Sequence, residues 1–246
     1  MFFELRSLLY ALLLSAGLEA TVFESNFIIV ITVILLFFSI WEGKVLGKKW
    51  RSVLTPAVFS ISSVALLYLI DASATKQIFI SLSFIMYYLL CLGIWRLKNC
   101  SGDQTASGLV MAAAATAILF FYSATYGIYL NFFVPLWVLM LLYLAATFLV
   151  SYQYFRILKD GNRKLVCTYS LVLGLIMAEI AWVINFWPFG YLTAGIISLI
   201  FYYILWDLNR SYFLNVLSKK RFVANVIFFG FLMGIVLLSS KWLPVV

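Results

Sequence analysis

The feature that most constrains this chain is a succession of apolar runs, separated by short segments that carry most of the charge. A helix needs roughly 20 apolar residues to cross the hydrocarbon core of a bilayer. The chain of 246 residues is 65% hydrophobic and only 11% charged, too few polar residues to cover a soluble fold. Because backbone groups in lipid must be hydrogen-bonded within their own segment, the runs predict helices. We therefore predict an all-α, polytopic transmembrane helix bundle forming a single transmembrane domain over residues 1–246.

We predict nine spans, or eight if the N-terminal segment is cleaved as a signal peptide or does not span. The first two runs are the least regular, because Glu19 and Glu24 interrupt them. The second run has room to continue past Trp41 through Glu42 towards Leu46. The expected spans cover residues 2–20, 27–41, 52–70, 77–95, 108–130, 133–154, 165–186, 191–207 and 222–240.

The basic residues fall in alternate loops, which indicates the orientation. With the N-terminus in the cytoplasm, 15 of the 17 Lys and Arg residues lie inside, and only Lys76 and Lys241 lie outside. We expect a multi-pass protein of the plasma membrane, which in bacteria is the inner membrane. The net charge of +8 then reflects loops that contact anionic membrane lipids, and we predict no binding of nucleic acid.

Two segments of eight residues resemble each other at an offset of 115. One begins at Ser83 and reads SFIMYYLL, and the other begins at Ser198 and reads SLIFYYIL. On one interpretation, residues 1–105 and 106–221 form a parallel repeat of four helices each, with 222–246 an appended last span. The other interpretation is coincidence in a chain that is 19% aromatic.

Acidic residues inside a span are costly and mark function by default. We place Glu179 alone deep within a span, about two turns or 10 Å from its outer end. The other acids fall in inner loops (Glu42, Asp103 and Asp160), in outer loops (Glu24 and Asp71) or at helix ends (Glu4, Glu19 and Asp207). Tyrosines within the spans, Tyr87 among them, would supply hydrogen-bond partners for Glu179.

The predicted ligand-binding site gathers around this acid and the aromatic turn that follows it. Glu179 either forms a hydrogen bond between helices, binds a proton or cation on a transport pathway, or acts as a catalytic acid. The site residues are Glu179, Trp182, Asn185, Trp187, Tyr202 and Tyr203.

Two further segments have alternative interpretations. Gly230 and Gly234 form a GxxxG motif, which predicts a homodimer or membrane-protein partner, or close packing within the chain. Residues 208–221 are either a helix extension ending in a basic anchor or an amphipathic helix at the membrane surface.

Several kinds of chemistry lack the residues they need. The chain has no histidine, which argues against His-ligated zinc and haem, and it has no Walker A loop or serine-hydrolase elbow. Cys91, Cys100 and Cys167 match no metal-binding spacing, and we interpret them as small apolar residues. We predict no catalytic residue, metal or cofactor. The expected function is a small solute or ion transporter or channel-type bundle, and the alternative is a non-catalytic scaffold or a subunit of a larger membrane complex.

The C-terminal third resembles uncharacterised multi-pass membrane proteins of bacteria. The residues that carry the resemblance are EIAW from Glu179, WPFGYLT from Trp187, the Tyr202–Tyr203 pair and the Asn209–Arg210 pair. That family is one of unknown function, so the resemblance implies a bacterial membrane and no particular activity.

Overall fold

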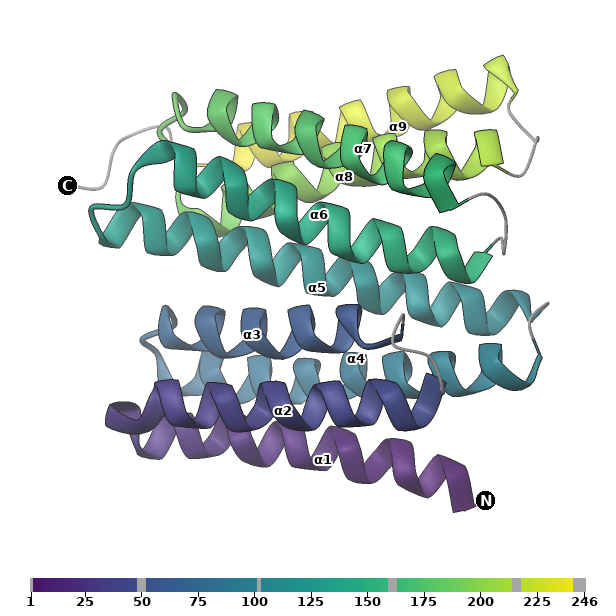
Figure 1. The fold of residues 1–246 in the computed structure, drawn as a ribbon. Coiled ribbons are helices and arrows are strands. Elements are labelled where there is room, and N and C mark those ends of the chain that lie inside the picture. The colour runs from purple at the N-terminus through teal and green to yellow at the C-terminus, as the bar shows by residue number, and fades with distance from the viewer. Residues whose placement is uncertain (1, 48–51, 101–102, 159–162, 214–217, 241–246) are drawn as a thin grey trace. The chain divides into compact units, whose positions relative to one another are not determined.

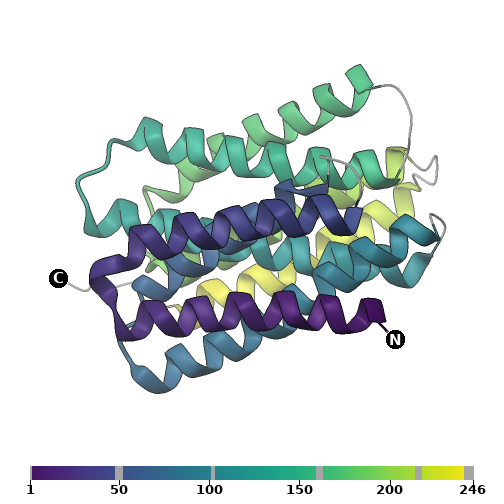
Figure 2. The same cartoon turned by 60° about the horizontal axis from the view of Figure 1, so that its bottom comes forward.

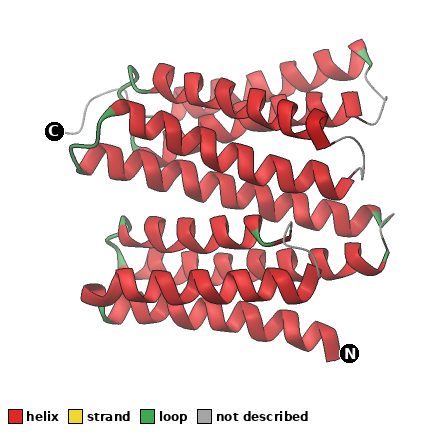
Figure 3. Cartoon of the chain, in the orientation of Figure 1, coloured by secondary structure: helices red, strands yellow, loops and turns green. Residues whose placement is uncertain are grey.

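The computed structural model describes residues 2–47, 52–100, 103–158, 163–213 and 218–240. Within these ranges the chain is helical, with short connections and no strand (Figure 3). The elements are α1 (Phe2–Phe23), the 3₁₀ turn η1 (Ser25–Phe27), α2 (Ile28–Gly47), α3 (Leu54–Tyr68), α4 (Ser73–Asn99), α5 (Gln104–Asn131), α6 (Leu136–Leu158), α7 (Arg163–Ile184), α8 (Tyr191–Phe213) and α9 (Lys219–Ser239). The predicted all-α bundle is confirmed, with one helix for each expected span.

Seven of the described helices are long and apolar enough to cross a membrane, namely α1, α2 and α4 to α8. The other two have shorter apolar stretches, over Leu54–Tyr68 in α3 and Val223–Ser239 in α9. At 1.5 Å per residue, the 15 residues of α3 extend about 22 Å, less than the hydrocarbon core of about 30 Å. The protein is thus a multi-pass membrane bundle in which two of the described helices have shorter apolar stretches than the other seven.

Helices α2 and α8 are among those that run further than the sequence predicts, and each extension includes an acid. α2 continues to Gly47, which confirms the alternative that the second run continues through Glu42 towards Leu46, and the prediction that Glu42 lies in a loop is wrong. α8 continues to Phe213, so Asp207 lies within a helix and not at its end. The continuation of α8 agrees with the helix-extension interpretation of residues 208–213, while residues 214–217 lie outside the described part of the chain. In both helices, polar residues were mistaken for a boundary.

The chain divides into two compact units, unit 1 (Met1–Phe121) and unit 2 (Tyr122–Val246). In unit 1, α1 packs on α4 and α2 packs on α3, and α2 also contacts α4 (Figures 1 and 2). In unit 2, α6 packs on α7, and α8 contacts both α7 and α9. In unit 2 the helices are therefore held mainly by their neighbours in sequence, whereas in unit 1 the most extensive contact joins the first and fourth helices.

Helix α2 is apolar outside and polar inside, the reverse of a soluble helix. Ile29 and Val33 on its outer face are 76% and 63% exposed. The inner stripe of Leu35, Ser39, Glu42 and Leu46 has the spacing of one helix face and is buried. Lipid covers such an outer face, and the inner stripe brings a serine and a glutamate into the core of unit 1.

Candidate functional site

Among the described acidic residues of unit 1, Glu42 has the most buried side chain. It lies on α2, five residues before Gly47 and hence about 7 Å from the helix end. Its side chain is only 2% exposed. Burying a carboxyl group costs free energy unless hydrogen bonds, a proton or a cation compensate for lost water. The contacts of Glu42 therefore decide what it can do.

Glu42 stands at the end of a chain of hydrogen bonds that crosses three helices. The Tyr87 hydroxyl on α4 lies 2.5 Å from Glu42 Oε2 and 3.1 Å from the Ser39 hydroxyl on α2. The Ser39 hydroxyl lies 2.5 Å from that of Ser60 on α3. Tyr87, Ser39 and Ser60 are all buried. Phe59 packs against the Tyr87 ring with centroids 5.5 Å apart and helps to keep water from this cluster.

The hydroxyl groups of this chain can satisfy Glu42 in either of its protonation states. Each hydroxyl has one hydrogen to donate and can also accept. When Glu42 is ionised, Tyr87 donates to the carboxylate, and Ser39 and Ser60 stay hydrogen-bonded to each other. When Glu42 is protonated, the carboxyl donates to Tyr87, Tyr87 donates to Ser39, and Ser39 donates to Ser60. The same positions thus satisfy both protonation states of the acid with a rotation of hydroxyl hydrogens.

Two more side chains interact electrostatically with Glu42, the Cys91 thiol on α4 and the Tyr10 hydroxyl on α1. Cys91 is fully enclosed, and Tyr10 is partly exposed. Among the described residues, no Lys or Arg forms an ion pair with Glu42. The group formed by Tyr10, Ser39, Glu42, Ser60, Tyr87 and Cys91 is called the Glu42 cluster below, and all four helices α1 to α4 contribute to it.

A family model described as "Protein of unknown function (DUF5656)" matches residues 2–239. The chain belongs to the DUF5656 family. The resemblance over the C-terminal third predicted a family of unknown function, and the match in fact covers nearly the whole chain. No curated protein and no solved structure matches it. The chemistry of this DUF5656 protein must therefore be argued from its own residues.

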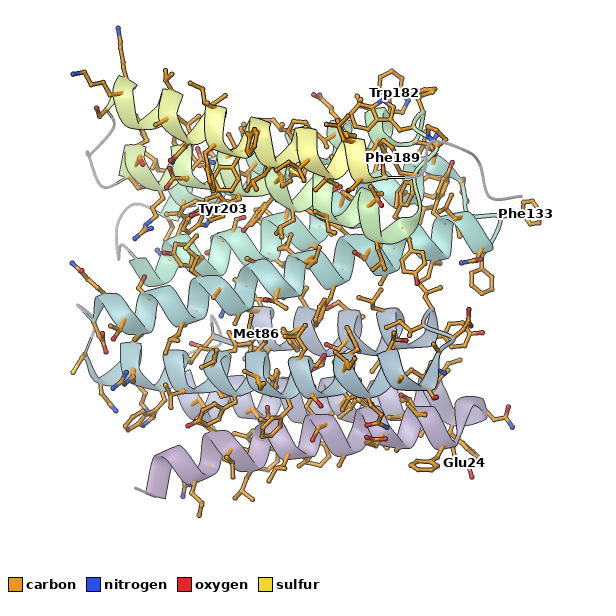
Figure 4. The ribbon with its side chains drawn as sticks, turned by 180° about the vertical axis from the view of Figure 1, so that it is seen from behind. Glu24, Met86, Phe133, Trp182, Phe189 and Tyr203 are labelled. Atoms are coloured by element: carbon orange, nitrogen blue, oxygen red, sulfur yellow. The ribbon has the colours of Figure 1, made fainter. Side chains whose placement is uncertain are left out.

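The site predicted from the sequence is spread over unit 2 of the DUF5656 protein. Glu179 lies on the exposed face of α7, five residues before Ile184. Trp182 is 47% exposed and packs edge-on against Phe186, and Figure 4 shows it well apart from Tyr203. Asn185 is partly buried in the turn after α7. No described contact joins Glu179 to the other five residues, and ligand binding there stays a prediction.

The remaining predicted site residues contact different neighbours. Trp187 packs edge-on against Phe189 in the turn before α8. Tyr202 is buried and lies 3.2 Å from the Ser151 hydroxyl of α6. Tyr203 faces α9, where its ring lies 4.7 Å from that of Phe229. Adjacent in sequence, the two tyrosines thus serve two different helix contacts.

The GxxxG motif of α9, formed by Gly230 and Gly234, has open space beside it. A Cβ atom added at Gly230 or Gly234 would meet nothing within 4 Å, so these glycines make no close helix contact within the described chain. The contacts of α9 with α8 lie elsewhere, including a hydrogen bond of 2.5 Å from the Asn225 amide to the Asp207 carboxylate. The homodimer through Gly230 and Gly234 stays a prediction.

Sequence reasoning missed the Glu42 cluster although its signals are present. Ser39 and Glu42 are three residues apart and share a helix face. Apolar residues continue beyond the acid at Val45 and Leu46. The signal was masked by Lys44 and the basic segment that follows, which made Glu42 look like part of a loop.

Proposed function

We propose that this protein is a non-enzymatic small-ion transporter of the plasma membrane, in which Glu42 binds and releases a proton. The observation that carries the proposal is a buried carboxyl group inside a membrane bundle, joined to a hydrogen-bond chain that satisfies both of its protonation states. An acidic residue kept within a membrane bundle is a candidate for a proton or ion pathway.

The environment of Glu42 favours a proton over a purely structural carboxylate. A structural carboxylate in a dry site is normally paired with a cation or with several donors. Glu42 has the single hydroxyl of Tyr87 as its described donor. A proton supplies the missing compensation without any rearrangement of the helices, because only hydroxyl hydrogens turn.

The orientation belongs to the same proposal. With the N-terminus in the cytoplasm, α2 runs inwards and Glu42 lies near the inner surface, a few residues before the basic segment of the sequence. Described basic residues occur in the last turns of α2, α4, α6 and α8, at Lys44, Arg96, Lys98, Arg156 and Arg210. This placement fits both the positive-inside rule and the helix dipole, which favours cations at helix C-termini. Protons would then exchange between Glu42 and the cytoplasmic side.

The first experiment tests proton binding. Infrared difference spectra of the purified protein, recorded across a pH titration, report the C=O stretch of a protonated carboxyl group. We expect a band from a buried carboxyl that disappears in Glu42→Gln and persists in Glu179→Gln, the matched control with an exposed acid. A spectrum in which Glu42→Gln removes no band contradicts the assignment of the proton to this residue.

The second experiment tests movement across the membrane. The protein is reconstituted into liposomes that hold a pH-sensitive dye, and a potassium diffusion potential drives protons inwards. We expect acidification with wild type and Glu179→Gln, and loss of it with Glu42→Gln. Wild-type vesicles that stay at the pH of empty liposomes would rule out proton transport, and the non-catalytic scaffold would then be the better interpretation.

A further inference from the structure

We infer that α1 to α4 and α5 to α8 are copies of one helical unit, and that the second copy retains the position of the Glu42 cluster but fills it with an aromatic pair. The inference deepens the proposed function and rests on it in one respect, since it assigns a single proton site to each chain. The correspondence itself stands on contacts within each unit.

The first correspondence joins α4 to α8 at an offset of 115 residues. Ser83, Tyr87 and Cys91 follow each other at intervals of four on α4, so they share one face of that helix. All three are buried. The same shift leads to Ser198, Tyr202 and Trp206 on α8, which are buried as well. The repeated sequence motif therefore presents the same face to the interior in both helices.

The second correspondence joins α2 to α6 at an offset of 112, and it lies outside the sequence motif. Ser39 corresponds to Ser151, and Glu42 corresponds to Tyr154. All four side chains are buried. Lys44 corresponds to Arg156, and each is the basic residue in the last turn of its helix. The difference of three residues between the two offsets falls in a region where α7 has 22 residues and α3 has 15.

One side-chain contact between these helices recurs. In unit 1, the hydroxyls of Ser39 and Tyr87 lie 3.1 Å apart. In unit 2, those of Ser151 and Tyr202 lie 3.2 Å apart. The motif shared by α4 and α8 does not by itself explain why a serine from α2 contacts Tyr87 and a serine from α6 contacts Tyr202. Coincidence in an aromatic-rich sequence therefore explains the motif but not the paired contacts.

The difference between the two copies lies one turn further along each helix. In unit 1, the Glu42 carboxyl and the Cys91 thiol interact. In unit 2, the corresponding Tyr154 and Trp206 rings pack edge to face with centroids 4.9 Å apart. A phenol and an indole hold no charge near neutral pH, and their rings fill the volume. Unit 2 thus keeps the serine–tyrosine hydrogen bond and has a tyrosine, not an acid, at the position that corresponds to Glu42.

The test moves the acid from one copy to the other. In a Glu42→Gln background, we combine Tyr154→Glu with Trp206→Cys, which recreates in unit 2 the residue types of the Glu42 cluster. The control combines Glu42→Gln with Val150→Glu, which places an acid at another buried position of α6. We expect the graft to fold and to regain a titrating buried-carboxyl band in infrared spectra, and we expect the control to unfold at a lower temperature than the graft.

Two results would overturn the inference. One is a graft that folds without regaining the band, or that is no more stable than the control. The other is an experimental structure in which superposing α2 and α4 on α6 and α8 leaves Tyr87 and Tyr202 facing different helices, and this measurement decides the matter even if neither variant folds. Because the infrared band is independent of ion flux, failure of the graft is distinguishable from failure of the transport proposal, which the Glu42→Gln flux measurement decides.

Discussion

At the scale of single residues, the Tyr87 hydroxyl holds the Glu42 cluster together, because it is the group that touches both the acid and the serine pair. A phenol at the centre of a hydrogen-bond chain both donates and accepts, so it transmits a change at one neighbour to the other. Its ring is anchored by Phe59, which limits the rotation of the side chain.

Replacing Tyr87 by Phe should therefore separate Glu42 from the serines while leaving the ring packing in place. We expect the variant to lose about 1–3 kcal/mol of unfolding free energy, since the buried groups left behind lose a partner. Tyr203→Phe is the control, since this ring is only partly buried and packs on α9. Thermal unfolding in detergent measures both, and equal stability of Tyr87→Phe and wild type would contradict the chain of hydrogen bonds.

Asp103, an acid that lies outside the membrane spans, has a local structural role. Asp103 precedes α5, and its carboxylate accepts hydrogen bonds from the Thr105 hydroxyl and from the backbone N–H groups of Thr105 and Ala106. This is the arrangement of a helix N-cap. The hydrogen bond from the Thr105 side chain is the largest cause that lowers the pKa of Asp103, and the backbone hydrogen bonds act in the same direction.

The lowered pKa of Asp103 sets the sign of a pH effect. The capping contribution is present above the ordinary aspartate value of about 4 and is lost as the pH falls below it, through the lower pKa of the folded state. We expect Asp103→Ala to lower the melting temperature at neutral pH and to matter less in strong acid. Melting curves of both proteins at several pH values check this, and a difference that grows in acid would contradict the N-cap.

The sequence predicts a buried acid with tyrosine partners at Glu179, and whether Glu179 binds a ligand stays a prediction. A buried acid with tyrosine partners was expected, and the structure has one, but at Glu42 and not at Glu179. Depth along the sequence favoured Glu179, because apolar residues surround it on both sides. Which face of a helix is turned inwards depends on the neighbouring helices. Because apolar residues surround Glu179 on all sides of its helix, the sequence does not indicate which face is buried.

At the scale of helices, close contacts in unit 2 occur where glycine removes a side chain. A Cβ atom added at Gly174 of α7 would lie 3.0 Å from the backbone carbonyl oxygen of Leu144 on α6. Gly195 of α8 packs in the same way against Ser123 of α5. Backbone atoms cannot give way as a flexible side chain can, so the α6–α7 contact has little tolerance.

Gly174→Ala should therefore push α7 away from α6 and cost about 1–3 kcal/mol, the usual range for an overpacked core. Gly230→Ala on α9 is the matched control, because nothing lies within 4 Å of the added atom and alanine favours helix over glycine. Unfolding in detergent compares the two. A Gly230→Ala variant that is as destabilised as Gly174→Ala would show that the α9 face packs against something in the folded protein.

Helix existence was predictable because apolar runs of membrane length leave the backbone no alternative. The positions of the helix ends were harder to predict. The ends of α2 and α8 were placed too early because Glu42 and Asp207 suggest an aqueous loop, yet each is buried with a hydrogen-bond partner, Tyr87 for the first and Asn225 for the second. Those partners lie on other helices, 45 and 18 residues away in the sequence, so no local sequence pattern predicts them.

At the scale of the whole molecule, the distribution of basic residues predicts a cytoplasmic N-terminus, and the native cysteines allow a direct test. Cys100 and Cys167 are exposed and lie on the predicted inner side, whereas Cys91 is buried. A membrane-impermeant maleimide should label Cys100 and Cys167 in inverted vesicles and leave them unlabelled in intact cells. Cys91 should stay unlabelled in both.

The control for this topology experiment is Ser73→Cys, at the start of α4 on the predicted outer side. It should be labelled in intact cells, which shows that the reagent reaches the protein. Labelling of Cys100 or Cys167 from outside would reverse the orientation and move Glu42 to the outer end of α2.

The shortness of α3 has a consequence for the surrounding bilayer. A helix of about 22 Å falls about 8 Å short of the hydrocarbon core, and a lipid-facing helix of that length would thin the membrane around it. Most of α3 is buried against its neighbours, so few acyl chains touch it. The longer helices around it set the hydrophobic thickness that the lipids meet. The cost of mismatch with bilayers of different acyl-chain length should therefore follow the length of these outer helices and not that of α3.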